Sequence, residues 1–158
     1  MAKKPHKPDD LPHLENRKAR YDYHVEDTLE CGIALMGSEI KSVRGGHVSL
    51  AEGFVRLTQE PPTLTLYQVH IGEYSPAAAL GHAATRTRIL LAHKNEINKW
   101  AKKMTKGMTI VPLKLYFKGP WAKLLIGLCK GKKAHDKRHD IAKRDSDRDL
   151  RRAMSKRA

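Results

Sequence analysis

The sequence has no long hydrophobic segment and almost no cysteine. No run of about 18 apolar residues occurs, so we expect no helix that spans a membrane. The first 20 residues, MAKKPHKPDDLPHLENRKAR, lack the apolar core of a signal peptide. The two cysteines, Cys31 and Cys129, lie far apart without CxxC spacing, which favours two buried thiols over a disulfide. These absences predict a cytoplasmic protein.

Aromatic residues are also scarce, at 6% of the chain. Proteins that bind single strands without sequence preference stack the bases on aromatic side chains. The composition therefore favours recognition of a folded RNA through its backbone, its 2′-hydroxyl groups and its shape. No helix-turn-helix or zinc-finger pattern is present, so DNA is a less favoured partner.

Patterns typical of catalysis or metal binding are absent as well. The nine histidines are scattered, and only His135 and His139 stand four residues apart, with no glutamate that completes a zinc-protease pattern. Neither a nucleophile elbow nor a phosphate-binding glycine loop occurs. We interpret Glu30 and Glu39 as solvated carboxylates rather than as an acid–base pair. The sequence thus predicts no metal and no cofactor, and an enzyme is the weaker alternative to a binding protein.

Positive charge is what the sequence has in excess. The 31 Lys and Arg residues against 17 Asp and Glu residues give a net charge of +14, above the magnitude of about 2–8 that suits a small solvated domain. A length of 158 residues fits one domain with extensions. Residues 130–158 hold 12 Lys or Arg and 5 Asp or Glu, which is half of the excess. This excess indicates an anionic partner, with nucleic acid favoured over an anionic membrane.

Five segments have the composition of β-strands. They contain β-branched and aromatic residues, and some have a partly alternating pattern of side chains. In residues 64–71 we expect successive side chains to alternate between the two faces without a break. Prolines 61 and 62 predict a loop and a hairpin, and Lys118-Gly119-Pro120 predicts a turn. Pro112 predicts a sheet edge or a bulge, because proline cannot donate to a ladder. The predicted strands are residues 21–35, 49–59, 63–74, 108–117 and 121–129.

Two short helices interrupt these strands. Ser38 is a candidate N-cap for the first, which Gly45-Gly46 ends. The second has apolar residues at helical spacing and ends at Gly107; they are Ile97, Trp100, Ala101 and Met104. We therefore predict a mainly β fold with short helices: an oligonucleotide-binding-type closed antiparallel β-barrel plus a basic C-terminal tail.

The tail, GKKAHDKRHDIAKRDSDRDLRRAMSKRA, has little to bury. It has no Gly or Pro after Gly131, and two favourable i,i+4 ion pairs permit helix. Its larger apolar residues do not form a stripe, so we predict that it is mostly disordered in the free protein and helical against a partner. A plain solubilising tail is the alternative. The predicted organisation is a flexible arm (1–13), a β-barrel RNA-binding domain (14–130) and the tail (131–158).

Four blocks of sequence resemble the SsrA-binding protein family, also called small protein B. They are NRKARYDYHVEDTLECGIALMGSEIKSVRGG (16–46), RTRILLAHKNEI (86–97), MTIVPLKLYFKG (108–119) and GKKAHDKR (131–138). The resemblance implies a protein without catalytic activity that binds transfer-messenger RNA and delivers it to stalled ribosomes for trans-translation. Implied partners are this RNA, the small ribosomal subunit with its decoding centre and message channel, and elongation factor Tu.

The resemblance also implies two sets of binding residues. Six residues are expected to hold the tRNA-like domain of the RNA: Asn16, Lys18, Glu30, Gly32, Leu91 and Lys123. Glu30 is unusual there, unless its carboxylate accepts hydrogen bonds from the RNA or orients a neighbouring Lys or Arg. Seven residues are expected to face the ribosome, where the barrel stands in for the missing anticodon stem and the tail lies in the empty message channel: Gly131, Lys132, Lys133, His135, Asp136, Lys137 and Arg138.

The chain also departs from the family pattern. Ala83-Ala84-Thr85 stands where Asp-Pro is common, and Ile89 stands where a second basic residue is common. Both departures lie in or beside the loop 75–88, to which we assign no contact, and positions after Asp145 match only in character. The alternative function is that of a translation factor with an oligonucleotide-binding fold that binds ribosomal RNA directly.

Overall fold

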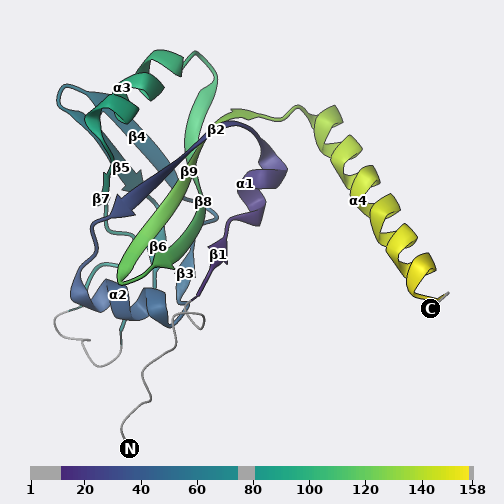
Figure 1. Cartoon of the computed structure of the whole chain (residues 1–158), viewed down its shortest axis with the longest axis horizontal. Helices are drawn as coiled ribbons and strands as arrows, with labels where there is room; N and C mark the ends of the chain where they lie inside the picture. The colour runs from purple at the N-terminus through teal and green to yellow at the C-terminus, as the bar shows by residue number, and fades with distance from the viewer. Residues whose placement is uncertain (1–11, 75–80, 157–158) are drawn as a thin grey trace, which may run out of the picture.

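A sheet forms the body of the molecule, and one helix extends away from it. The computed structural model describes residues 12–74 and 81–156. Helices α2 and α3 lie at opposite ends of the sheet, and α4 projects from the body as a separate rod (Figure 1). The predicted arm lies outside the described residues except for Pro12 and His13. None of the helices within the described ranges is long and apolar enough to cross a membrane.

The described part of the chain contains nine strands and four helices. The strands are β1 (Leu14–Glu15), β2 (Tyr23–Ile33), β3 (Val48–Ser49), β4 (Phe54–Gln59), β5 (Pro62–Tyr67), β6 (His70–Ile71), β7 (Arg88–Leu91), β8 (Met108–Lys118) and β9 (Trp121–Gly131). The helices are α1 (Arg17–Asp22), α2 (Gly37–Arg44), α3 (Lys94–Lys103) and α4 (Ala134–Ser155). The prediction of a mainly β fold with short helices is confirmed.

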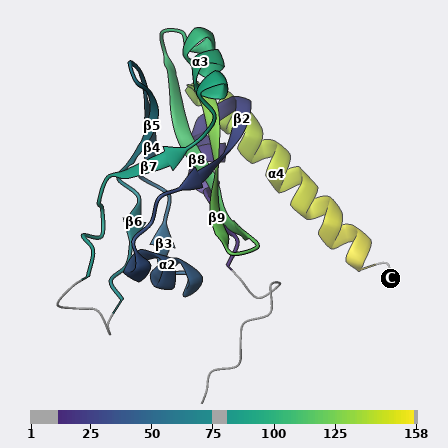
Figure 2. The ribbon, with the colours of Figure 1, turned by 60° about the vertical axis from the view of Figure 1, so that its left-hand side comes forward.

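Seven strands form one antiparallel sheet in the order β1-β8-β4-β5-β7-β2-β9, and β9 also pairs with β8. The series of pairings that starts at β8 and runs through β4, β5, β7, β2 and β9 therefore returns to β8. The two longest ladders join β9 to β2 and to β8 (Figure 2). Gly119, with a φ of 60°, makes the predicted turn between β8 and β9. Strands β3 and β6 form a separate two-stranded sheet.

Proline and backbone conformation set the irregular points of the strands. The predicted bulge is confirmed, because the β8–β9 register shifts between Pro112 and Lys114. The predicted hairpin around prolines 61 and 62 is also confirmed, by β4 and β5. The prediction that side chains alternate between the two faces without a break through residues 64–71 is wrong. Gln68 has a φ of 59°, which ends β5, so Val69 and Ile71 both turn toward the core.

The helices begin and end close to the predicted positions. Helix α2 begins at Gly37 with Met36 as its N-cap, so the prediction of Ser38 as N-cap is wrong. The Ser38 hydroxyl instead lies 2.9 Å from Nδ1 of His82. Helix α3 buries Ile97 and Trp100 as predicted. The short helix α1 was not predicted, because its residues continue into the aromatic stretch of β2.

The larger of two hydrophobic clusters among the described residues fills the space inside the sheet. Strands β5, β8 and β9 supply many of its fully buried members, and α3 closes one end with Ile97 and Trp100. Both cysteines are buried and free, as predicted. Burial raises the pKa of Cys31 to about 12 and that of Cys129 to about 11, so both remain protonated thiols.

Glu39 is the main polar group of the interior, and the prediction that it is solvated is wrong. Its carboxylate is completely buried and accepts from Arg88 Nε, Arg86 Nη2 and Met36 N, each at 2.8 Å. Arg88 is 1% exposed and also donates to the carbonyl oxygen of Val69 at 2.8 Å. Burial alone raises the pKa of Glu39, but the hydrogen bonds from Arg86, Met36 and Arg88 outweigh it and lower this pKa to about 2. The Glu39–Arg88 ion pair stays charged because its carboxylate and its guanidinium are both hydrogen-bonded.

We expect Glu39→Gln to lower the free energy of unfolding by about 3–5 kcal/mol, because it leaves the buried Arg88 guanidinium without its counter-charge. Urea unfolding at neutral pH measures this loss. The matched control is Glu26→Gln, which removes an exposed pair with Lys130 and should change stability little. Equal effects of the two substitutions would contradict the assigned role of Glu39.

The same variant has a pH signature. The folded-state pKa of about 2 lies below the ordinary value of 4.5, so the unfolded chain binds the proton first as the pH falls. The contribution of Glu39 to stability is complete above pH 4.5 and is lost between 4.5 and 2. Unfolding free energy should therefore depend less steeply on pH in that window when residue 39 is Gln.

Candidate nucleic-acid interface

Four of the six predicted RNA-binding residues meet on one face of the sheet. Gly32 in β2 pairs with Leu91 of β7 on one side and with Lys123 of β9 on the other. Glu30 precedes Gly32 by two residues and so points to the same face. We call Glu30, Gly32, Leu91 and Lys123 the β2–β7–β9 surface. Leu91 and Lys123 line two hollows on this face.

Because Gly32 has no side chain, Leu91 of β7 can lie close to the backbone of β2. A Cβ atom at this position would lie 3.2 Å from Cβ of Leu91, tighter than an ordinary contact. The Leu91 side chain thus lies over bare backbone and remains 60% exposed. An exposed leucine beside a lysine and an uncovered backbone suits the close approach of a sugar or a base edge.

Glu30 is held by neighbouring side chains on the same face. Its carboxylate accepts from the hydroxyl of Tyr116 and lies 3.6 Å from Nζ of Lys118. The Tyr116 hydrogen bond, with help from Lys118, lowers the pKa of Glu30. Burial and the bond to Glu30 raise the pKa of Tyr116 to about 12. Glu30 is therefore ionised at neutral pH and can orient Lys118, one of the two roles considered for it.

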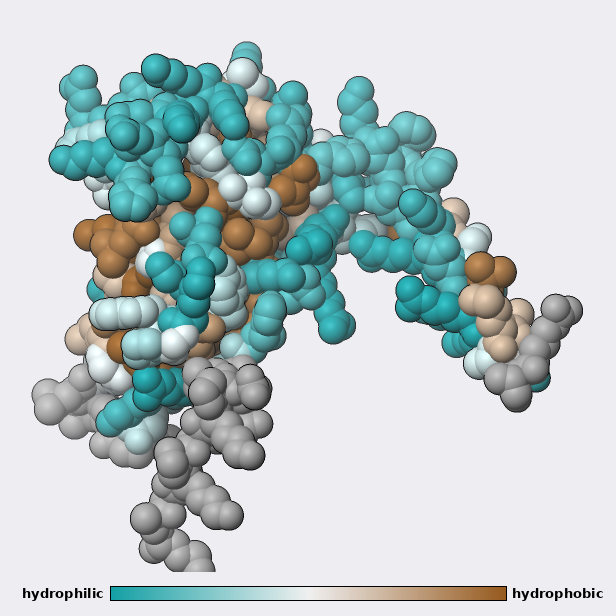
Figure 3. Space-filling model, viewed as in Figure 1, coloured by the Kyte–Doolittle hydropathy of each residue, from teal (hydrophilic) through white to brown (hydrophobic). Residues whose placement is uncertain are grey.

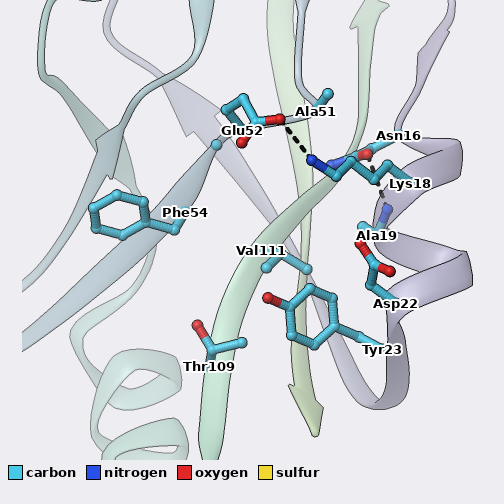
Figure 4. A pocket seen from close by; sticks show the side chains of 11 residues that line it. Asn16, Lys18, Ala19, Asp22, Tyr23, Ala51, Glu52, Phe54, Thr109 and Val111 are labelled. Carbon is cyan, nitrogen blue, oxygen red and sulfur yellow. Dashed lines mark hydrogen bonds and ion pairs between the residues drawn. The ribbon is translucent and has the colours of Figure 1, made fainter. Parts of the chain in front are cut away.

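Asn16 and Lys18 lie elsewhere, around α1. Asn16 is only 4% exposed; its Nδ2 donates to the carbonyl oxygens of Leu50 (3.0 Å) and Pro112 (2.8 Å), and its Oδ1 caps α1 by accepting from Ala19 N. Both N–H groups of its side chain are used within the chain and the side chain is buried, so its geometry is that of a positioning residue. Lys18 is exposed and pairs with Glu52 at 2.6 Å across a hollow beside β8 (Figure 4).

The seven predicted ribosome-facing residues lie where β9 leads into α4. The structure has a continuous helix from Ala134 to Ser155, whereas the sequence predicted helix only against a partner. Local pairing and the absence of Gly and Pro favour the helix, and none of its residues is buried. Hydrophilic side chains follow α4 for most of its length (Figure 3). The order of this segment in the free protein in solution stays a prediction.

The first turns of α4 are attached to α1 by cations. Lys132 has only 8% of its side chain exposed; its Nζ donates to the carbonyl oxygen of Arg20 and pairs with Asp140. Lys137 Nζ lies 3.1 Å from Oδ1 of Asp22. We call these contacts, together with the stacking described next, the α1–α4 contact. Two of the predicted ribosome-facing lysines are thus already occupied within the chain.

Tyr21 adds an aromatic face to the α1–α4 contact. Lys137 Nζ lies 5.6 Å from the centroid of its ring, and Cζ of Arg144 lies 6.0 Å from the same centroid. The predicted signature therefore divides into two groups. Lys133, His135 and Arg138 are exposed, and Lys132, Asp136 and Lys137 are partly buried toward α1 and β2, where Asp136 lies 3.6 Å from His24.

Several residues of this region were missed from the sequence. Tyr21, Asp22 and Tyr116 were assigned to strands, and their contacts depend on chain segments that are distant in sequence. The one local signal was Asn16 followed by RKAR, an N-cap before helix-forming residues. Within residues 12–74 and 81–156, no group of three or more His, Cys, Asp or Glu side chains is placed to hold a metal ion.

Comparison with known proteins gives matches over most of the chain. The family model described as "SmpB protein" matches residues 13–156. A protein named SsrA-binding protein from Lactobacillus delbrueckii subsp. bulgaricus is 53% identical over 87% of this chain and 90% of its own length. The protein of the same name from Carboxydothermus hydrogenoformans is 49% identical, over 89% of this chain and 93% of its own length.

A solved structure is similar as well. It is described as "tmRNA-SmpB: a journey to the center of the bacterial ribosome" and superimposes with a TM-score of 0.65 at 43% sequence identity. The match covers 78% of this chain and 86% of that chain. The similarity to this solved structure therefore includes the sequence as well as the fold.

The α1–α4 contact makes a prediction about the mobility of the tail. In Asp22→Asn, backbone amides of residues 134–145 should exchange with deuterium roughly two- to fivefold faster, because an exposed ion pair contributes about 0.2–1 kcal/mol. Hydrogen exchange read by mass spectrometry measures this. The control is Glu52→Gln, which removes the ion pair with Lys18 at the start of α1 and should leave the exchange of α4 unchanged. An Asp22→Asn chain that exchanges like the unmodified protein would show that the ion pair does not hold α4.

Proposed function

This chain belongs to the SmpB family, and from that membership we propose that it binds transfer-messenger RNA, the SsrA RNA, and acts with it in trans-translation on the ribosome. The observation that carries the proposal is the agreement over residues 13–156 with that family, at about half identity to proteins named SsrA-binding protein. The net charge of +14 suits a polyanionic partner.

We assign the tRNA-like domain of the RNA to the β2–β7–β9 surface. Lys123, with Lys118 oriented by Glu30, supplies cations for the phosphates. Gly32 and the exposed Leu91 let a sugar or a base edge approach the backbone. Lys18 extends the basic area from the side of α1, once RNA competes with Glu52 for its ammonium group. Asn16 serves the interface by fixing α1.

We assign the body of the protein to the oligonucleotide-binding class of closed barrels. The series of pairings that leads from β8 through β4, β5, β7, β2 and β9 back to β8 supports this. A closed sheet of this size leaves its outer face for oligonucleotides, which suits the position of the β2–β7–β9 surface.

We assign the ribosome-facing step to α4 and the exposed residues at its start. The 22 residues of α4 make a rod about 33 Å long at 1.5 Å per residue. It is rich in cations, and none of its residues is fully buried, so an RNA-lined channel such as an empty message channel is a suitable partner. In this scheme the barrel occupies the place of the missing anticodon stem, elongation factor Tu accompanies the complex, and the protein works in the cytoplasm.

The test is to recover the protein from cells and to sequence the RNA that accompanies it, using the full chain and a chain truncated after Lys130. We expect transfer-messenger RNA as the dominant RNA with both, because the truncation leaves the β2–β7–β9 surface in place. The truncated chain should fail to support peptide tagging on stalled ribosomes.

Two outcomes would contradict this division. Recovery of ribosomal RNA alone from the full chain would favour the direct ribosomal-RNA binder. Loss of transfer-messenger RNA on truncation would place the RNA contact in the tail instead of the sheet. An unchanged melting temperature of the truncated chain serves as the folding control.

A second prediction concerns Lys123. Lys123→Ala should weaken binding to transfer-messenger RNA, and it should lower the slope of log affinity against log salt by about 1, as expected for one lost phosphate contact. Titrations between 50 and 200 mM salt measure both. Lys106→Ala, at an exposed lysine beyond α3, is the charge-matched control and should leave affinity and slope nearly unchanged. An unchanged slope in Lys123→Ala would remove Lys123 from the phosphate contacts.

A further inference from the structure

Trp121, the first residue of β9, has no evident structural role. It is 69% exposed, the highest value among the large hydrophobic side chains of the described residues. Trp100, the other tryptophan of the chain, is 4% exposed, and its indole N–H donates to Asp27 at 3.1 Å. An indole left in water forgoes a large favourable burial, so its exposure points to a binding partner.

Trp121 stands at the edge of an apolar hollow. Pro120 and Ala122 flank it, and the hollow continues to Gly32, Leu91 and Lys123 of the β2–β7–β9 surface; its other lining residues are Ile33, Ala34, Leu35 and Ile40. The hollow is therefore one end of the proposed RNA surface, with a wall of aliphatic side chains.

The one charged side chain that lines this hollow is positive. None of its lining residues is acidic, and Lys123 is one of them. Lys118, whose ammonium group lies 3.6 Å from Glu30, stands directly opposite Trp121 in the β8–β9 ladder. A ligand that fits has a flat apolar group with negative charge on either side of it. A nucleotide within an RNA chain has this chemistry.

We propose that Trp121 stacks on one unpaired nucleobase of the bound RNA, while Lys123 and Lys118 neutralise the adjoining phosphates. This rests on the proposed function and adds a contact of a different kind to it. The low aromatic content agrees with a single aromatic anchor instead of a platform for successive bases. The expected occupant is an extruded or loop nucleotide, because a base within a helix has no free face.

Trp121→Ala tests the proposal in binding titrations of the full chain with transfer-messenger RNA. Affinity should fall roughly five- to 150-fold, the range that corresponds to the loss of one base–aromatic stack. Trp121→Phe should keep much of the affinity, because a phenyl ring still stacks. In both variants the salt slope should stay as in the unmodified protein, since no charge is removed, which separates this effect from that of Lys123→Ala.

Tryptophan fluorescence gives a second and direct readout. Addition of the RNA should quench the emission of Trp121 in the unmodified chain, whereas Trp121→Phe, which reports only the buried Trp100, should change little. Tight RNA binding with unquenched Trp121 and with full affinity in Trp121→Ala would overturn the inference and leave the proposed function intact. Failure of the unmodified chain to bind the RNA would overturn both. Quenching by a protein partner in the absence of RNA would assign the hollow to protein and refute the nucleobase.

Discussion

The buried ion pair between Glu39 and Arg88 determines which side chains of β7 face outward. It ties helix α2 to the first residue of β7. Because side chains alternate along a strand, an inward Arg88 obliges Ile89 and Leu91 to face outward, as their exposure of 53% and 60% shows. The position of Leu91 beside Gly32 and Lys123 thus depends on a charge pair in the interior. The buried Arg88 thus decides which side chains of β7 reach the surface.

Much of the fold could be predicted from local signals. Alternation, paired prolines and Gly119 identified most of the strands and two hairpins, and Pro112 identified a bulge, because each depends on neighbouring residues only. Strands β1 and β7 were missed. Failures occurred where the decisive partner is remote. Glu39 looks like an ordinary first-turn carboxylate until Arg86 and Arg88, more than 45 residues later, cover it. Gln68 gave no sign that it adopts a positive φ.

The candidate site divides in the same way. Four of the residues taken from the family resemblance are brought together by the register of the sheet. Their spacing in the sequence does not reveal this, because they come from three strands. Asn16 came from the same block of sequence, yet its hydrogen bonds point inward. Trp121 was placed in a predicted strand, but periodicity cannot distinguish an inward from an outward residue at the end of a strand.

The tail continues directly from β9, and this has a mechanical consequence. From Trp121 to Gly131 this strand is hydrogen-bonded on one side or both, to β8 and to β2. A pull on α4 along the strand direction loads the two ladders in shear, so many bonds must fail together before the strand slides. Lys123 belongs to the same strand. Tension on α4 is therefore transmitted to the β2–β7–β9 surface without unravelling the strand.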